Sequence, residues 1–178
     1  MITLIAGTNR KNSRTRFVTD RIHDIVKDKL GQTTHQINLE DLSHDMYNPD
    51  MYSADGQHSD LGQVQDESII PADLWIIVTP EYNGSYSGAI KLFIDALSVR
   101  KYADTFRGKK VALVGVAAGR AGNLRGMEHL TGLLNYLGMV VYPDKLPISS
   151  VEKVIQEDNL DAATIETLEK WVEGLRSF

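Results

Sequence analysis

The sequence predicts a doubly wound α/β fold with a parallel sheet of five strands. Short apolar runs alternate along the chain with longer segments in which apolar residues recur at helical spacing. The run at 74–78 is apolar throughout, as expected of a strand that is covered on both faces. Strands that alternate with helices are joined by right-handed crossovers, which make the strands parallel and place helices on both faces.

The first part of the chain contains two of the predicted strands. The first strand is expected at 2–6 and ends at Gly7, and a helix with an apolar stripe follows and ends at residue 30. Residues 33–39 alternate weakly between apolar and polar types and suit the second strand. The polar segment at 41–66 has no sustained period, so a loop is predicted there.

The middle of the chain contains the third and fourth strands, at 74–78 and 111–116. The helix between them is expected to begin near Ser87, and its apolar stripe is formed by Ile90, Phe93, Ile94 and Leu97. A glycine-bearing segment after the fourth strand leads into a helix that ends at Gly138. The stripe of this second helix comprises Met127, Leu130, Leu133, Leu134 and Leu137.

The last part of the chain contains the fifth strand, at 139–142, closed by Pro143. The final helix is expected to start between residues 158 and 161, and one of its faces carries Ile165, Leu168, Val172 and Leu175. No internal repeat or linker marks a second unit. The 178 residues are therefore expected to form a single domain, 1–178.

The composition excludes several classes of protein. The chain has no cysteine, so disulfides, thiolate zinc sites, iron–sulfur clusters and cysteine nucleophiles are impossible. The net charge of -5 argues against a general nucleic-acid binder, because affinity for a phosphate backbone needs a concentrated basic face. The first apolar run is too short for a signal peptide or a membrane span. We therefore expect a cytoplasmic protein with no nucleic-acid or membrane partner.

Three loops of unusual composition follow the first, third and fourth strands, at the edge where an open parallel sheet has its binding crevice. The first loop, Gly7 to Thr15, reads GTNRKNSRT and directly precedes a helix N-terminus. Backbone N–H groups, hydroxyls and arginines there suit an anion, and a terminal monophosphate fits better than a pyrophosphate because only Gly7 is present. The sequence matches neither the nucleoside-triphosphate loop nor the dinucleotide fingerprint. The alternative is a capping loop with solvated basic residues.

The second loop begins at Pro80 and contains two tyrosines, Tyr82 and Tyr86, that can face a planar heterocycle. Asn83 and Gly84 form a turn that allows a ring to approach closely, and Ser85 can cap the helix that follows. This combination suits an isoalloxazine ring. The alternative is a tyrosine-lined turn that packs on a neighbouring subunit.

The third loop carries two glycines, Gly119 and Gly122, among small alanines. These small residues leave room for the edge of a ligand to contact the backbone. Alternatively, they mark only a turn after the strand.

Together the three loops resemble those of the NADPH-dependent FMN reductase family, which comprises flavodoxin-like flavin, quinone, azo-dye and chromate reductases. The family signature Pro-Glu-Tyr-Asn-Gly-Ser is intact at 80–85, and the first-loop pattern stands at 7–15 as GTNRKNSRT. The family's third loop is approximated by Ala118-Gly119-Arg120-Ala121-Gly122 and Arg125. The resemblance extends over about residues 1–150.

The resemblance implies an FMN-dependent oxidoreductase that passes hydride from NADPH or NADH through FMN to a small electron acceptor. It also implies a homodimer or homotetramer, and FMN rather than a side chain would carry the chemistry. Thr15 replaces the family asparagine and Ala118 stands where serine is common, so both are expected to weaken FMN binding without abolishing it. The residues implied to bind FMN are Thr8, Arg10, Ser13, Arg14, Thr15, Pro80, Glu81, Tyr82, Asn83, Gly84, Ser85, Ala118 and Gly119.

Two other functions stay open at this point. A flavodoxin-type electron carrier would bind FMN without turning over NAD(P)H, and a binding module would keep the fold without the cofactor. A metal site is not expected, because the spacing of His44 and His58 among aspartates matches no zinc or calcium pattern.

Overall fold

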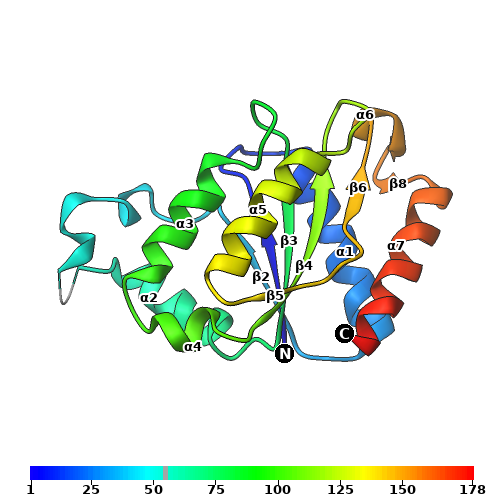
Figure 1. Ribbon diagram of the computed structural model, residues 1–178. Coiled ribbons are helices and arrows are strands. Elements are labelled where there is room, and N and C mark those ends of the chain that lie inside the picture. Colours follow the sequence, from blue (N-terminus) through cyan, green and yellow to red (C-terminus); the bar gives the residue numbers. More distant parts are fainter. Residues whose placement is uncertain (54–55) are drawn as a thin grey trace.

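The computed structural model describes residues 1–53 and 56–178, which are built around a parallel sheet (Figure 1). The strands lie in the order β2-β1-β3-β4-β5, and a further short strand, β6, pairs with β4. The order 2-1-3-4-5 is that of flavodoxin-like folds, so the predicted fold class is confirmed. The strands of this sheet are β1 (Ile2–Ala6), β2 (Thr34–Asn38), β3 (Leu74–Pro80), β4 (Lys110–Val116), β5 (Val140–Val141) and β6 (Leu146–Ile148), and β7 (Ile155–Gln156) and β8 (Asn159–Leu160) form a separate antiparallel pair.

The fifth strand differs from the single strand predicted at 139–142. β5 pairs with the start of β4, whereas β6 pairs with its end, so two short strands share one edge of the sheet. Pro143 lies between them and has no N–H to donate to a neighbouring strand. The chain therefore leaves the sheet near Pro143 and returns to it three residues later, at Leu146.

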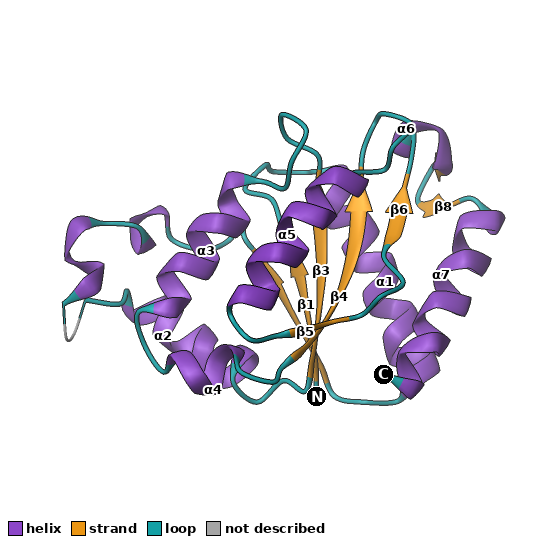
Figure 2. Ribbon diagram, in the orientation of Figure 1, coloured by secondary structure: helices purple, strands orange, loops and turns teal. Residues whose placement is uncertain are grey.

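Helices cover both faces of the sheet (Figure 2). Alternate residues of β3 belong to different apolar clusters: Ile76 packs with residues of α1 and α7, whereas Trp75 and Ile77 pack with residues of α3 and α5. This burial on two faces explains the unbroken apolar run at 74–78. The helices are α1 (Arg14–Leu30), α2 (Ser59–Val64), α3 (Gly88–Ser98), α4 (Tyr102–Phe106), α5 (Leu124–Tyr136), α6 (Val151–Val154) and α7 (Ala162–Gly174).

Side-chain caps fix the first turns of three helices. The hydroxyl of Ser13 accepts from the N–H of Arg16 at the start of α1, and Asp161 caps α7 in the same way. Ser87 caps α3 by accepting from the N–H of Ile90, so the prediction that Ser85 is this cap was wrong. No helix within the described ranges is both long and apolar enough to cross a membrane.

The segment at 41–66 was predicted to be a loop, but its end is helical. Helix α2 continues directly into a π-helical turn, η3 (Gln65–Ile69), and the two form the crossover between β2 and β3. Two 3₁₀ turns, η1 (His44–Met46) and η2 (Pro49–Tyr52), precede them. The apolar period is hidden because the buried face includes a glutamine, Gln65, beside the apolar residues Leu61 and Ile69. No group of three or more potential metal ligands occurs in the part of the chain that the structure describes.

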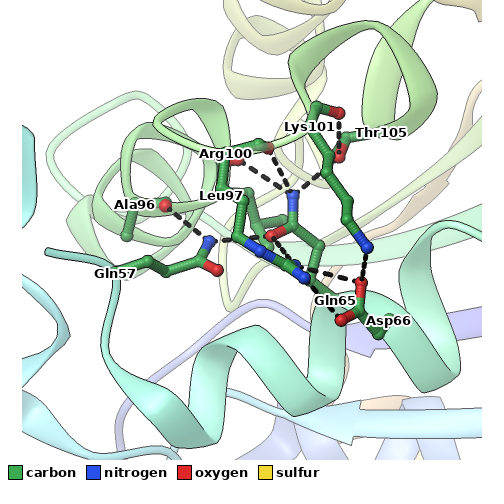
Figure 3. Close-up of polar contacts among 8 residues, drawn as sticks. All are labelled: Gln57, Gln65, Asp66, Ala96, Leu97, Arg100, Lys101 and Thr105. Carbon is green, nitrogen blue, oxygen red and sulfur yellow. Dashed lines mark hydrogen bonds and ion pairs between the residues drawn. The ribbon is translucent and has the colours of Figure 1, made fainter. Parts of the chain in front are cut away.

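Gln65 anchors this crossover to the end of α3, to α4 and to the turn between them (Figure 3). Its buried amide nitrogen donates to the carbonyls of Leu97 and Arg100 and to the hydroxyl of Thr105, at 2.7–3.1 Å. Its amide oxygen accepts from the side chain of Gln57 at 2.8 Å. A buried amide is stable only when its polar atoms have partners, so this glutamine takes a core position that an apolar residue would otherwise fill.

The next residue, Asp66, extends the network to the surface. Its carboxylate accepts from both terminal nitrogens of Arg100, at 3.0 and 2.6 Å, and from Lys101 Nζ at 2.8 Å. Hydrogen bonds from Arg100 and then Lys101 lower the pKa of Asp66 from 3.8 to about 2. The pairs stabilise the fold above about pH 4, and this contribution is lost as the pH falls toward 2, because the unfolded state takes up the proton first.

We expect Asp66→Asn to lower the melting temperature at pH 7 by about 1–3 °C, since the ion pairs are partly exposed. The difference from the unsubstituted protein should be smaller at pH 3, because the unfolded state is then largely protonated at this carboxyl group and part of the stabilisation has been lost. Thermal melts by circular dichroism at the two pH values measure this. Asp158→Asn is the control, because Asp158 is exposed and makes no ion pair among the described residues. An equal difference at both pH values would contradict the assignment.

Candidate functional site

The three loops singled out in the sequence meet around one pocket at the carboxyl ends of β1, β3 and β4. The cavity measures about 450 Å³, a volume within the usual range for small-molecule and cofactor sites. Two residues of α6 complete its wall. The lining residues are Arg10, Lys11, Asn12, Ser13, Arg14, Thr15, Pro80, Glu81, Tyr82, Val116, Ala117, Ala118, Val151 and Glu152.

The pocket brings together most, but not all, of the residues predicted to bind a cofactor. Those that line it are Arg10, Ser13, Arg14, Thr15, Pro80, Glu81, Tyr82 and Ala118. The others belong to the same three loops but are not part of the wall, namely Thr8, Asn83, Gly84, Ser85 and Gly119.

The first loop forms a cationic cradle at the start of α1. The chain turns at Gly7, where a Cβ atom would lie 2.3 Å from the side chain of Ile90, so only glycine fits. After Ser13 caps Arg16, the N–H groups at the very start of the helix have no acceptor within the helix, and they favour an anion. Arg10 and Lys11 are exposed and pair with no carboxylate in the ranges 1–53 and 56–178.

The other two basic residues of this segment, Arg14 and Arg16, form ion pairs with carboxylates. Arg16 pairs with Glu40 and Asp41 and does not line the pocket. Arg14 lines the pocket, but its guanidinium pairs with Glu152, with Nη2 2.9 Å from Oε2. The hydrogen bond that Arg14 donates to Glu152 raises the pKa of Arg14, and the negative charge of Glu152 adds to this effect.

Thr8 joins the first loop to the second from beneath the pocket. Its side chain is buried, and its hydroxyl forms a 2.7 Å hydrogen bond with the phenol oxygen of Tyr82. The same hydroxyl accepts from the backbone N–H of Arg10 at 3.1 Å. Thr8 therefore connects two lining residues, Arg10 and Tyr82, although it does not line the pocket itself.

The second loop is a tight hairpin over the pocket. The backbones of Tyr82 and Ser85 exchange hydrogen bonds at 2.9 and 3.1 Å. Asn83 and Gly84 between them have φ of 52° and 73°, the positive values of a type I′ turn, which Asn-Gly adopts readily. The hydroxyl of Ser85 pairs with His129 Nδ1 on α5 at 2.9 Å. Tyr86 packs against the apolar core beside α3 and does not line the pocket.

The third loop is fixed by a residue that the sequence analysis missed. Asn123 is buried and has φ of 63°, and its amide nitrogen donates to the carbonyls of Thr79 and Pro80 at 3.1 and 2.8 Å. These bonds join the start of α5 to the end of β3. The sequence does contain a sign of this turn, because Asn123 follows Gly122 and both residue types are common at left-handed backbone positions.

The wall contributed by Val151 and Glu152 was also missed. The N–H groups of Ser150 and Val151 donate to the carbonyls of Gly119 and Ala117, both at 3.0 Å, so this segment lies against the third loop. Nothing in the composition of residues 149–152 points to a site. Only the return of β6 to β4 places them beside the first loop.

These residues fit a ligand with an anionic end and a flat end. Cations, hydroxyls and helix N–H groups of the first loop surround one part of the pocket. The ring of Tyr82 and the small side chains of Ala117 and Ala118 surround another part, where a planar ring can lie against them.

Comparison with known proteins identifies the family. A family model described as NADPH-dependent FMN reductase matches residues 1–153. The chain belongs to this family. The predicted membership of the NADPH-dependent FMN reductase family is thus confirmed, and with it the predicted FMN cofactor and the predicted class of activity, FMN-dependent NAD(P)H oxidoreduction.

Individual relatives agree with this membership. An NAD(P)H-dependent FMN reductase of Pseudomonas aeruginosa is 33% identical over 153 residues, which cover 79% of this chain and 80% of the relative. An NADPH azoreductase of a Bacillus species is 30% identical over 131 residues, covering 72% of this chain and 65% of the relative. The solved structure of FerB, a flavoenzyme NAD(P)H:(acceptor) oxidoreductase from Paracoccus denitrificans, aligns with a TM-score of 0.82 and 23% identity, covering 99% and 94% of the two chains.

The bond between Thr8 and Tyr82 should contribute measurably to stability, because both hydroxyls are at least partly buried. A double-mutant cycle of Thr8→Val and Tyr82→Phe should give a coupling energy of about 0.5–1.5 kcal/mol in urea unfolding. Valine keeps the shape of threonine, so the cycle reports on the hydroxyls. Strictly additive free energies of unfolding would show that the two loops are not joined in this way.

Proposed function

We propose that the pocket binds FMN with its phosphate in the first loop and its ring between the second and third loops. Arg10, Lys11, Ser13, Arg14 and Thr15 would hold the phosphate, together with the N–H groups at the start of α1. The observation that supports this arrangement is the convergence of a cationic cradle and the Tyr82 hairpin on one cavity. Thr8, Asn83, Gly84, Ser85 and Gly119 would support or edge the site from the same loops.

The protein would mainly position the cofactor and shield it from water. Bound FMN supplies the transfer of hydride from a nicotinamide to a second substrate, so no catalytic side chain is required. The N–H groups of Tyr82 and Ser85 bond within the hairpin, so those of Asn83 and Gly84 would be the ones to reach the ring, and Tyr82 is held by its bond to Thr8. Pro80 and Ala118 would contact the ring edges and exclude water.

We further propose that the acceptor is a small conjugated compound such as a quinone or an azo compound. The supporting observations are the lining by Tyr82, Ala117 and Ala118 and the similarity to an azoreductase. A homodimer or homotetramer is proposed because apolar side chains on α3 and α5, among them Leu92, Leu124 and Tyr136, are exposed. A single domain in the cytoplasm, without nucleic-acid or membrane partners, completes the proposal.

Absorbance spectra test this function directly. We expect the purified protein to take up FMN, to lose the flavin absorbance on anaerobic addition of NADPH or NADH, and to regain it when a quinone is added. An electron carrier would bind FMN but would not be bleached by either nicotinamide. Failure to take up FMN would indicate a binding module and would contradict the proposal.

Arg10→Ala should weaken FMN binding by about 1.5–3 kcal/mol, as expected for the loss of hydrogen bonds to a charged group. Titration of FMN into the protein, followed by flavin fluorescence, measures this. Arg107→Ala is the matched control, because Arg107 is exposed and precedes β4, at the opposite end of the sheet. If the two variants bind FMN equally well, the first loop does not hold the phosphate.

A further inference from the structure

Glu152 places a carboxylate in the wall of the cationic cradle. Its Oε1 and Oε2 accept from Arg14 Nε at 3.2 and 3.1 Å, and Arg14 Nη2 lies 2.9 Å from Oε2 as part of the ion pair. Two of the three guanidinium nitrogens of Arg14 are therefore occupied by an internal anion. A carboxylate is an unexpected component of a pocket that is otherwise suited to a phosphate.

The backbone around Glu152 holds this carboxylate in place. The preceding residue, Val151, is buried, and its N–H donates to the carbonyl of Ala117. The N–H of Ser150 donates to the carbonyl of Gly119 in the same loop. Arg14 is the first residue of α1, and Glu152 lies in the first turn of α6. Both members of the pair therefore stand on fixed backbone.

The second carboxylate in the wall, that of Glu81, makes no ion pair among the described residues. Within the part of the chain that the structure describes, Glu152 is therefore the one carboxylate that reduces the charge of the cradle by direct contact with a cation that lines the pocket. It acts in two ways on an incoming phosphate: it competes for Arg14, and it repels the dianion.

We propose that Glu152 is a specificity-determining residue that lowers the affinity of the pocket for phosphorylated flavins relative to flavins without a phosphate. This inference rests on the proposed FMN site. Exchange of Arg14 from Glu152 to the phosphate is the rearrangement that binding requires. An unphosphorylated flavin leaves the pair between Arg14 and Glu152 intact.

Glu152→Gln tests the inference by binding alone. FMN and riboflavin are titrated separately into each protein at low salt, and the dissociation constants are obtained from flavin fluorescence. We expect Glu152→Gln to bind FMN about 3- to 10-fold more tightly, because one unit charge near the phosphate is removed. The affinity for riboflavin should change by less than about twofold, and the gain for FMN should shrink at 0.5 M salt, where the charges are screened.

Glu166→Gln is the matched control. Glu166 is also an exposed carboxylate that forms an ion pair, with Lys170 at 2.6 Å, but it lies on α7 and does not line the pocket. This variant should leave both affinities unchanged. The double variant Arg14→Ala/Glu152→Gln should bind FMN more tightly than Arg14→Ala, because the repulsion by Glu152 remains in the single variant.

Several outcomes would overturn the inference. Weaker FMN binding by Glu152→Gln would mean that Glu152 orients Arg14 for the phosphate. Unchanged FMN binding would mean that Glu152 has no influence on the phosphate. Equal tightening for riboflavin would mean that Glu152 does not act through the phosphate. If the unsubstituted protein binds FMN and only the effect of Glu152→Gln is missing, this inference alone fails. If it binds neither flavin, the proposed function fails as well.

Discussion

The strands β1, β3 and β4 are buried between two layers of helices, and this burial determines where the three loops of the site leave the sheet. Successive residues of β3 belong to opposite apolar clusters, so a shift of one residue would exchange the two faces. Because the strands are parallel and adjacent, their carboxyl ends lie at one edge. Loops that are distant in the sequence therefore meet there, and the same register sets which of their side chains face the pocket.

Hydrogen bonds between the loops turn this meeting point into a defined cavity. Ser87 donates to the carbonyl of Gly7 at 2.5 Å, Thr8 bonds to Tyr82, and Asn123 donates to the end of β3. The donors in these contacts are at least partly buried, where an unpaired polar group is costly. The hairpin and the first loop are therefore held in their relative positions before any ligand enters, which reduces the ordering that binding would require.

The charges of the first loop have separate roles, although they look alike in the sequence. Arg10 and Lys11 face the pocket without an internal carboxylate partner among the described residues, whereas Arg16 is bound by Glu40. Arg14 shares its guanidinium with Glu152. The net positive character of the cradle is thus smaller than the number of basic residues at 10–16 indicates. In the proposed site, a ligand phosphate would have to compete with the carboxylate of Glu152 for Arg14.

The sequence by itself determined the fold class, the boundaries of most elements and the three loops of the site, because apolar periodicity and the motif at 80–85 are local features. It missed the helix at the end of 41–66, since a buried Gln65 interrupts the apolar period there. Only the tertiary structure decided which side chains pair, that Ser87 rather than Ser85 caps α3, and that Thr8 lies behind the pocket wall. Arg14 and Glu152 are 138 residues apart, and no local pattern encodes their contact, because it arises from the return of β6 to the sheet.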